Sequence, residues 1–206
     1  MSDFTAFAEF QMDVLKEVGN IGAGHAATAL STLLDKPVDM LVPKVRLVPF
    51  EEVADTVGGN EKIILAIFLR VEGETSGNMF FLLSLESAKR MLQSIAGIEV
   101  EDSEHFSEME LSALNEIGNI LAGSFLTSLA DFTKLSMSPT VPALAIDMAG
   151  AIVSYGLLEY GQMGDRAMLI DTKFLNGQDT IEGQFYFIPD PQSFDTIFSA
   201  LGVPPK

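Results

Sequence analysis

The chain has 206 residues, and its 29 acidic and 12 basic residues give a formal net charge of −17 at pH 7. Such a charge repels the phosphates of nucleic acids and anionic lipid headgroups, so we expect neither nucleic acid nor a membrane surface as a partner. No cysteine is present, which excludes disulfides and thiolate metal sites.

The N-terminal segment carries acids where a signal peptide carries positive charge. The longest apolar run, residues 63–69, is too short to cross a bilayer. We therefore expect a cytoplasmic protein without membrane insertion. Its hydrophobic content of 48% is sufficient for a sizeable core.

The first predicted element is helical. Apolar residues recur at intervals of three and four from about Ala6 to Leu34, and Pro37 follows that stretch. Three segments rich in Val, Ile, Leu and Phe come next, bounded by Gly, Pro and Asn, which predicts strands. The predicted strands are 38–50, 62–71 and 76–84, and a short helix over 85–96 closes this part of the chain.

The same order of elements is predicted for the rest of the chain. Ser107 is a suitable N-cap with Glu110 at the capping-box position, so a helix is expected over about 107–134. Strands are predicted over 137–146, 166–174 and 180–188, and a closing helix over 191–201. The expected fold class is α+β, with a six-stranded, mostly antiparallel sheet flanked by helices around a pseudo-twofold axis.

A short motif occurs twice. Residues 17–21, Glu-Val-Gly-Asn-Ile, return as residues 116–120, Glu-Ile-Gly-Asn-Ile. Over the longer stretches 12–24 and 111–123, seven of thirteen positions are identical, where average composition gives about one. We therefore expect two related halves, about 1–100 and 101–206. The junction between them is short and acidic, so the prediction is a single pseudo-symmetric domain covering residues 1–206.

Each predicted helix carries a polar face. At about 100° per residue, the acid and the amide of the motif share an arc of about 60° with two further positions. The outward sets are Asp13, Glu17, Asn20 and Gly24 in the first helix, and Ser112, Glu116, Asn119 and Gly123 in the second. The neighbouring arcs, expected to meet the core, are Val14, Val18, Ile21 and His25, and Ala113, Ile117 and Ile120.

Acid and amide side chains on a helix exterior usually do no more than contact solvent. The duplication favours a function, and so do the glycines, because each makes a helix about 1 kcal/mol less stable than alanine would. Gly24 and Gly123 lie on the polar faces, where they would let a partner's surface approach. Gly19 and Gly118 lie nearer the core, where helix packing is the better explanation.

The spacing of these residues resembles a known signature: Asp or Ser, three residues, Glu, two residues, Asn, and a proline a little over twenty residues on. This pattern is similar to that of the CheC/CheX/FliY family of phosphatases, which act on the phosphorylated chemotaxis response regulator CheY. The similarity spans essentially the whole chain and both motifs. Residue by residue, it implies two active sites, namely Asp13, Glu17, Asn20 and Pro43, and Ser112, Glu116, Asn119 and Pro142.

The substrate implied by the resemblance is the aspartyl phosphate of the receiver, which holds Mg²⁺ in its own site. The chain itself is therefore expected to bind no metal and no other cofactor. A carboxamide can hold an attacking water in line without adding negative charge, as a glutamine does in GTPases, which suits Asn20 and Asn119. The resemblance implies that Glu17 and Glu116 pair with a lysine of the receiver.

The remaining members of the signature are expected to act indirectly. An acid and a hydroxyl interchange at Asp13 and Ser112, so we expect accessory hydrogen bonding or docking there. Pro43 and Pro142 are expected to shape the chain beneath each helix.

Asp147 stands alone in the apolar run 143–153 and is expected to cap a short helix. The alternative is a partner-binding surface, because the resemblance implies binding to CheD, a receptor-modifying deamidase.

A second function for the whole chain also stays open. Its two polar faces could dock a response regulator without catalysis, as an adaptor of the chemotaxis or flagellar switch apparatus.

Overall fold

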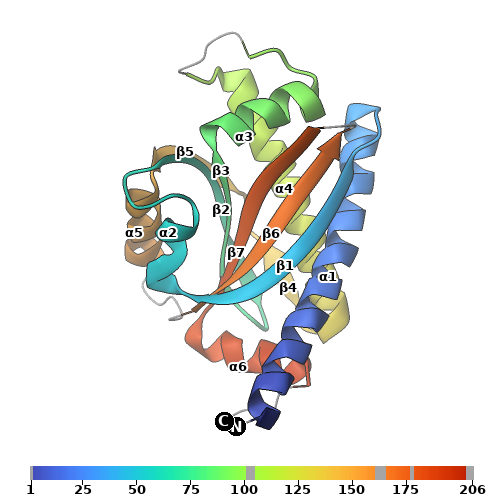
Figure 1. Cartoon of the computed structure of the whole chain (residues 1–206), viewed down its shortest axis with the longest axis vertical. Helices are drawn as coiled ribbons and strands as arrows, with labels where there is room; N and C mark the ends of the chain where they lie inside the picture. Colours follow the sequence, from blue (N-terminus) through green and yellow to red (C-terminus); the bar gives the residue numbers. More distant parts are fainter. Residues whose placement is uncertain (1, 101–104, 161–165, 177–178, 203–206) are drawn as a thin grey trace.

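The computed structural model describes residues 2–100, 105–160, 166–176 and 179–202, and its strands form one curved antiparallel sheet (Figure 1). The α+β class and the mostly antiparallel sheet predicted above are confirmed. In spatial order the strands are β1 (Asp39–Pro49), β6 (Arg166–Asn176), β7 (Asp179–Pro189), β3 (Gly77–Ser84) and β2 (Ile63–Gly73), after which β4 (Met137–Pro139) and β5 (Ala143–Met148) both pair with β2.

The sheet interleaves strands from the two parts of the chain. β1 pairs with β6, and β4 and β5 pair with β2, so the first strand of each part lies against a strand of the other part. β3 and β7 pair at the centre, with Met79 opposite Phe187. Backbone hydrogen bonds therefore join the first and second parts of the chain along most of the sheet.

The predicted strand 137–146 is divided into two. Residues 140–142 separate β4 from β5; Pro139 stands just before this gap and Pro142 is its last residue. Proline has no N–H to donate to a sheet ladder, so a strand that contains two prolines loses its pairing between them. β1 contains one internal proline, Pro43, and accommodates it by a register shift between Leu41 and Lys44.

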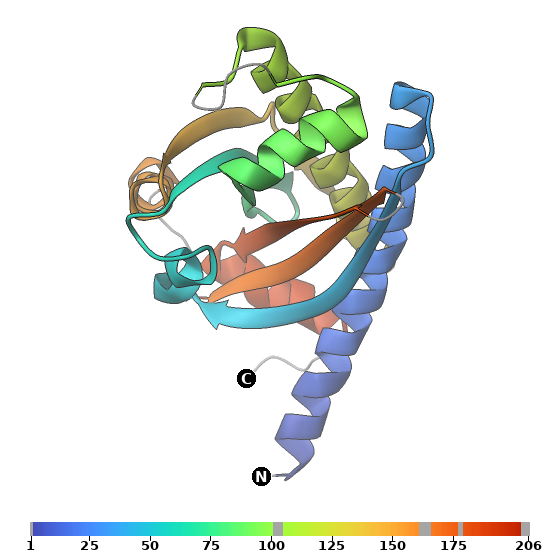
Figure 2. The ribbon, with the colours of Figure 1, turned by 45° about the horizontal axis from the view of Figure 1, so that its top comes forward.

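Two long helices cover one face of the sheet. α1 (Ser2–Leu34) runs along the β1 edge, and α4 (Glu108–Thr133) packs against α1 (Figures 1 and 2). The two helices approach closely, because a Cβ atom at position 22, which is glycine, would lie 3.1 Å from the Cα of Phe125. The main core fills the space between these helices and the sheet.

The start of α4 is the one predicted from the sequence. The Oγ of Ser107 accepts a hydrogen bond from the N–H of Glu110 at 3.3 Å, and a carboxylate oxygen of Glu110 accepts from the N–H of Ser107 at 2.6 Å. This capping box satisfies two N–H groups at the end of the helix. α4 ends at Thr133, and its C-cap residue Lys134 adopts the left-handed conformation with φ of 61°.

Shorter helices complete the two layers. The opposite face of the sheet is covered by η1 (Phe50–Glu52), α2 (Val53–Thr56) and α5 (Ala149–Tyr160). On the first face, α3 (Leu85–Arg90), the π-helical turn η2 (Met91–Ala96) and α6 (Pro191–Ala200) pack on the main core.

Beneath α2, the buried hydroxyl of Tyr186 hydrogen-bonds to Thr56. Burial raises the pKa of Tyr186 to about 12, so this hydroxyl stays protonated. No helix within the described ranges combines the length and the apolar composition that crossing a membrane requires.

The expectation that Asp147 caps α5 is wrong. The first N–H groups of α5 donate to the carbonyl oxygens of Lys62 and Asn60, at 2.8 and 3.0 Å. The Oδ1 of Asp147 instead accepts from the N–H of Met148 at 2.7 Å, and its side chain is exposed. The loop before β2 therefore supplies the acceptors that a capping side chain would otherwise provide.

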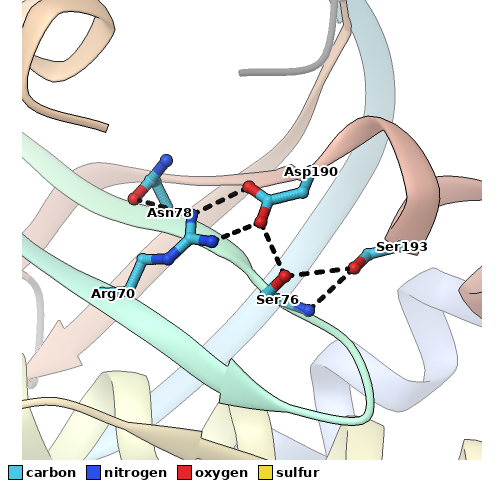
Figure 3. Close-up of polar contacts among 5 residues, drawn as sticks. All are labelled: Arg70, Ser76, Asn78, Asp190 and Ser193. Carbon is cyan, nitrogen blue, oxygen red and sulfur yellow. Dashed lines mark hydrogen bonds and ion pairs between the residues drawn. The ribbon is translucent and has the colours of Figure 1, made fainter. Parts of the chain in front are cut away.

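A polar cluster ties β2 to the start of α6 (Figure 3). The guanidinium of Arg70 forms a two-pronged ion pair with Asp190, one prong measuring 2.8 Å from Nη1 to Oδ1. The hydroxyl of Ser76 donates to Asp190 at 2.6 Å, and Ser193 Oγ accepts from the N–H of Ser76 at 2.8 Å. Burial alone would raise the pKa of Asp190, but the hydrogen bonds from Arg70 and Ser76 and the charge of Arg70 together hold it below its usual value.

We predict that Asp190→Asn lowers the free energy of unfolding at neutral pH by about 2 kcal/mol, the scale of a hydrogen bond to a charged group. Because the folded pKa lies below the unfolded one, the carboxylate stabilises the fold above pH about 4 and this contribution is lost as the pH falls further. Urea unfolding at pH 7 and pH 3 should therefore show a larger difference between variant and parent at pH 7.

The matched control is Lys173→Ala, which removes a cross-strand ion pair whose two side chains are 39% and 68% exposed. Solvent screens such a pair, so this variant should lose less than about 1 kcal/mol. An Asp190→Asn variant as stable as the control at pH 7 would contradict the structural role of the cluster.

Candidate active site

Both predicted polar faces lie on the molecular surface. On α1, Asp13, Glu17 and Gly24 are exposed and Asn20 is half-buried. On α4, Ser112 and Glu116 are exposed, and Asn119 and Gly123 are half-buried. In each helix the acid and the amide are three residues apart, which places them one turn apart on the same side. The structure thus brings each predicted set together on its own helix face.

The buried side of α1 differs from the expected one. Ile21 is 46% exposed and His25 is exposed, so their predicted place in the core is wrong. Val18 is buried and Val14 packs on the core as predicted, and Leu15 and Leu30 are buried as well. Small residues on this side of α1 let α4 and the sheet approach closely. The buried face of α1 is therefore rotated away from the face that its large apolar residues predict. On α4 the expectation holds better, since Ile117 is buried and Ala113 and Ile120 pack on the core.

The four motif glycines have two different roles. A Cβ at position 19 would lie 3.3 Å from Val42 Cγ1, and one at position 118 would lie 2.5 Å from Ile67 Cδ1, so both glycines permit close packing. A Cβ at Gly24 or Gly123 would meet nothing within 4 Å. These two glycines therefore leave open space beside the acid and the amide, as the sequence predicts.

The side chain of Asn20 is held by the sheet. Its Oδ1 accepts a hydrogen bond from the backbone N–H of Val42 at 2.9 Å. Val42 lies at the register shift of β1, next to the half-buried Pro43 of the signature. Sequence analysis did not find this contact, although the proline in the signature marks the segment where it occurs.

The second site lacks this contact in the part of the chain that the structure describes. Val141 occupies the position that matches Val42, but it lies in the gap between β4 and β5 and is 88% exposed. No hydrogen bond joins it to Asn119 among the described residues. One turn away on α4, the Oδ1 of Asn115 is buried without a hydrogen-bond partner. The two faces thus share their residue types but differ in how the amide is supported.

The two faces also differ in charge. Asp13 and Glu17 place two carboxylates one turn apart on α1, whereas α4 presents the hydroxyl of Ser112 beside Glu116. The face on α1 is the more acidic, and each attracts a cationic group more than an anionic one. Neither helix face closes over its polar side chains, so a substrate must bring its own pocket.

An open groove extends the face of α1 toward the start of β1. Its volume is about 490 Å³, and its wall includes Gly24, Thr28, Ser31, Val38 and Met40. Sequence analysis missed this groove, because its two walls are an amphipathic helix and a strand edge that only the fold brings together. The hydroxyl of Thr28 donates to the carbonyl of Gly24 at 2.9 Å, so this hydroxyl is not a free donor in the groove.

Comparison with known proteins points to one family. A sequence profile of the CheC-like family matches residues 10–46 and 109–146, which hold both polar faces and both signature prolines. The chain is 44% identical over 206 residues to the CheY-P phosphatase CheC of Bacillus subtilis (strain 168), covering 98% of this chain and 99% of that protein. It is 31% identical over 134 residues to the flagellar motor switch phosphatase FliY of the same organism, covering 64% of this chain and 35% of that protein.

The fold has counterparts among solved structures. The crystal structure of Thermotoga maritima FliY matches with a TM-score of 0.73 at 19% sequence identity, covering 93% of this chain and 96% of that chain. At this identity the likeness concerns the fold alone.

The different surroundings of the glycines on α4 give a stability test. Gly118→Ala should lower the free energy of unfolding by about 1–3 kcal/mol, because the added methyl group overlaps Ile67 of the packed core. The matched variant Gly123→Ala adds the same methyl group to open space, so it should raise stability by up to about 1 kcal/mol through helix propensity. Thermal unfolding monitored by circular dichroism distinguishes the two, and equal melting temperatures would refute the packing role of Gly118.

Proposed function

The chain belongs to the CheC-like family, and we propose that it hydrolyses the aspartyl phosphate of a phosphorylated CheY response regulator at the two faces described above. The relative named CheY-P phosphatase matches nearly the full length of both chains at 44% identity, which makes the chain a hydrolase of this kind. The observation that carries the mechanism is the acid and amide pair exposed on α1 and again on α4. We place this activity in the cytoplasm, where the receiver acts.

The reaction needs little from the phosphatase beyond orientation. Water attacks phosphorus in line, the bond from phosphorus to the receiver's aspartyl oxygen breaks, and the products are inorganic phosphate and the free carboxylate. The receiver holds Mg²⁺, which neutralises charge on the phosphoryl oxygens, so this chain adds no metal of its own. Asn20 or Asn119 positions the water, and a neutral amide does so without repelling the phosphoryl group.

The acids are assigned to alignment. A carboxylate close to phosphate would repel it, so Glu17 and Glu116 pair instead with a cation, for which the receiver's active-site lysine is suited. The exposure of both acids permits this contact. Asp13 and Ser112 lie one turn before Glu17 and Glu116 on their helices and serve as accessory docking groups. Pro43 belongs to the register shift of β1, which supports a structural role for that proline.

The match to a CheY-P phosphatase favours an enzyme over a non-catalytic adaptor of the chemotaxis or flagellar switch apparatus, although the docking surface of an adaptor would also need exposed acid and amide groups. Catalytic turnover separates the two functions. A trace of the chain mixed with excess phosphorylated receiver should release many equivalents of phosphate if it is an enzyme. An adaptor would change the phosphate lifetime only in proportion to the complex formed.

We predict that Asn20→Ala combined with Asn119→Ala slows stimulated dephosphorylation on the order of 10²-fold, the scale of losing a positioned polar catalytic group. Each single variant should retain the activity of the other face. The measurement is phosphate release from phosphorylated receiver under multiple-turnover conditions. A double variant that is folded and turns over at the parent rate would remove both asparagines from the mechanism.

We further propose that the surface around Asp147 binds the deamidase CheD. Asp147 is exposed at the end of β5, and large apolar side chains are exposed near it. Ile63 on the paired strand is 42% exposed and Met148, the residue opposite it, is 45% exposed. An apolar patch with one acid is typical of a protein interface, in which the charge sets orientation.

The charge reversal Asp147→Lys should weaken binding of CheD by about tenfold or more, as expected when one charge of an interface is inverted. Asp147 lies on β5 and the two polar faces lie on α1 and α4, so phosphate release in the absence of CheD should be unchanged. Titration calorimetry with purified CheD measures the first effect. Unaltered affinity would place the deamidase elsewhere on the molecule.

A further inference from the structure

The bulge in β1 carries a backbone N–H that the sheet does not use. β1 lies at the end of the strand order, and residues 42 and 43 both stand opposite one residue of β6, because the pairing jumps from Leu41 with Lys173 to Lys44 with Asp171. The N–H of Val42 points instead to α1, where it donates to Asn20. Proline at position 43 has no N–H, so this bulge leaves a single donor to be satisfied.

We propose that the peptide N–H of Val42 locks the carboxamide of Asn20 with its oxygen inward, so that the amino group is what this face presents to the substrate. This inference rests on the proposed phosphatase function and identifies which group of Asn20, the amino group, would contact the substrate. Val42 then acts as a positioning residue, through its backbone, and Asn20 as the catalytic residue.

The direction of the amide follows from donor and acceptor chemistry. A carboxamide has one oxygen acceptor and one amino group with two donors, whereas a peptide N–H can only donate. The flipped carboxamide would place its amino group against the N–H of Val42, and the hydrogen bond would be lost. Val42 is 2% exposed, so water cannot readily replace the missing acceptor.

The packing around this contact keeps it in place. Gly19 lies one residue before Asn20, and a side chain there would press on Val42, since a Cβ would come within 3.3 Å of its Cγ1. Glycine at this position thus allows the strand to approach the helix to hydrogen-bonding distance. Asn20 itself is half-buried, which leaves the amino end of its amide accessible to a docked receiver.

An outward amino group suits the reaction at this face. The phosphoryl oxygens carry the negative charge of the transferring group, and a donor near them is stabilising where an oxygen would repel. A donor already oriented before docking needs no ordering when the receiver binds. The face on α4 differs, because Val141 is 88% exposed in the gap between β4 and β5 and no hydrogen bond joins it to Asn119 among the described residues.

Hydrogen exchange on the intact chain tests the contact without any activity measurement. In Asn20→Ala the amide of Val42 loses its acceptor and should exchange on the order of tenfold faster, the effect of losing one hydrogen bond. In Asn20→Asp an oxygen still accepts, so protection should be retained. The internal control is Val141, whose exchange should not change in Asn119→Ala. Equal exchange of the Val42 amide in the parent chain and in Asn20→Ala would overturn the proposal.

The activity arm uses Asn119→Ala as the background, so that only the face on α1 works. There Asn20→Asp should lose phosphate release as fully as Asn20→Ala does, because the aspartate keeps the bond to Val42 but lacks the amino group. Near-normal activity of Asn20→Asp in this background would show that the reaction does not need the amino group of Asn20. Failure of the phosphatase function itself is distinguishable, because the parent chain would then show no multiple-turnover phosphate release, while the amide of Val42 would still exchange faster in Asn20→Ala.

Discussion

The close packing of α1 against both β1 and α4 is the constraint from which the candidate site follows. Gly22 lets the backbone of α4 approach, and Gly19 lets Val42 reach the helix. A helix held this close to an edge strand can satisfy an N–H that the sheet leaves unpaired, and Asn20 does so. The opposite side of α1 is left to solvent, and it carries the acids of the polar face.

The second helix follows the same plan with a different result. Gly118 allows α4 to approach Ile67 of β2, as Gly19 allows α1 to approach β1. The strand that would match β1 is broken between β4 and β5, so it places no ordered N–H beside Asn119 in the described structure. Two faces with the same acid and amide can therefore differ in how much order the amide has before a partner binds.

An open polar face explains why the proposed reaction needs another protein to complete the site. Exposed carboxylates and amides cannot by themselves exclude water or stabilise a developing charge. In the proposed reaction a receiver already holds the metal and the phosphoryl group, so the same side chains would need only to be correctly placed. The net charge of −17 is compatible with this proposal, in which the acids pair with a cationic group of the partner and not with the phosphate.

Local patterns in the sequence determined the two long helices, the capping box at Ser107 and the succession of helices and strands along the chain, because periodicity and caps depend on near neighbours. They also determined that Glu17 and Asn20 share a helix face. Only the tertiary structure decided which side of α1 is buried, and it left Ile21 exposed because contact with α4 occurs through small residues. It alone also decided the bond between Asn20 and Val42, because that contact depends on a bulge in β1 and on the close packing of α1 against that strand, which no local pattern encodes.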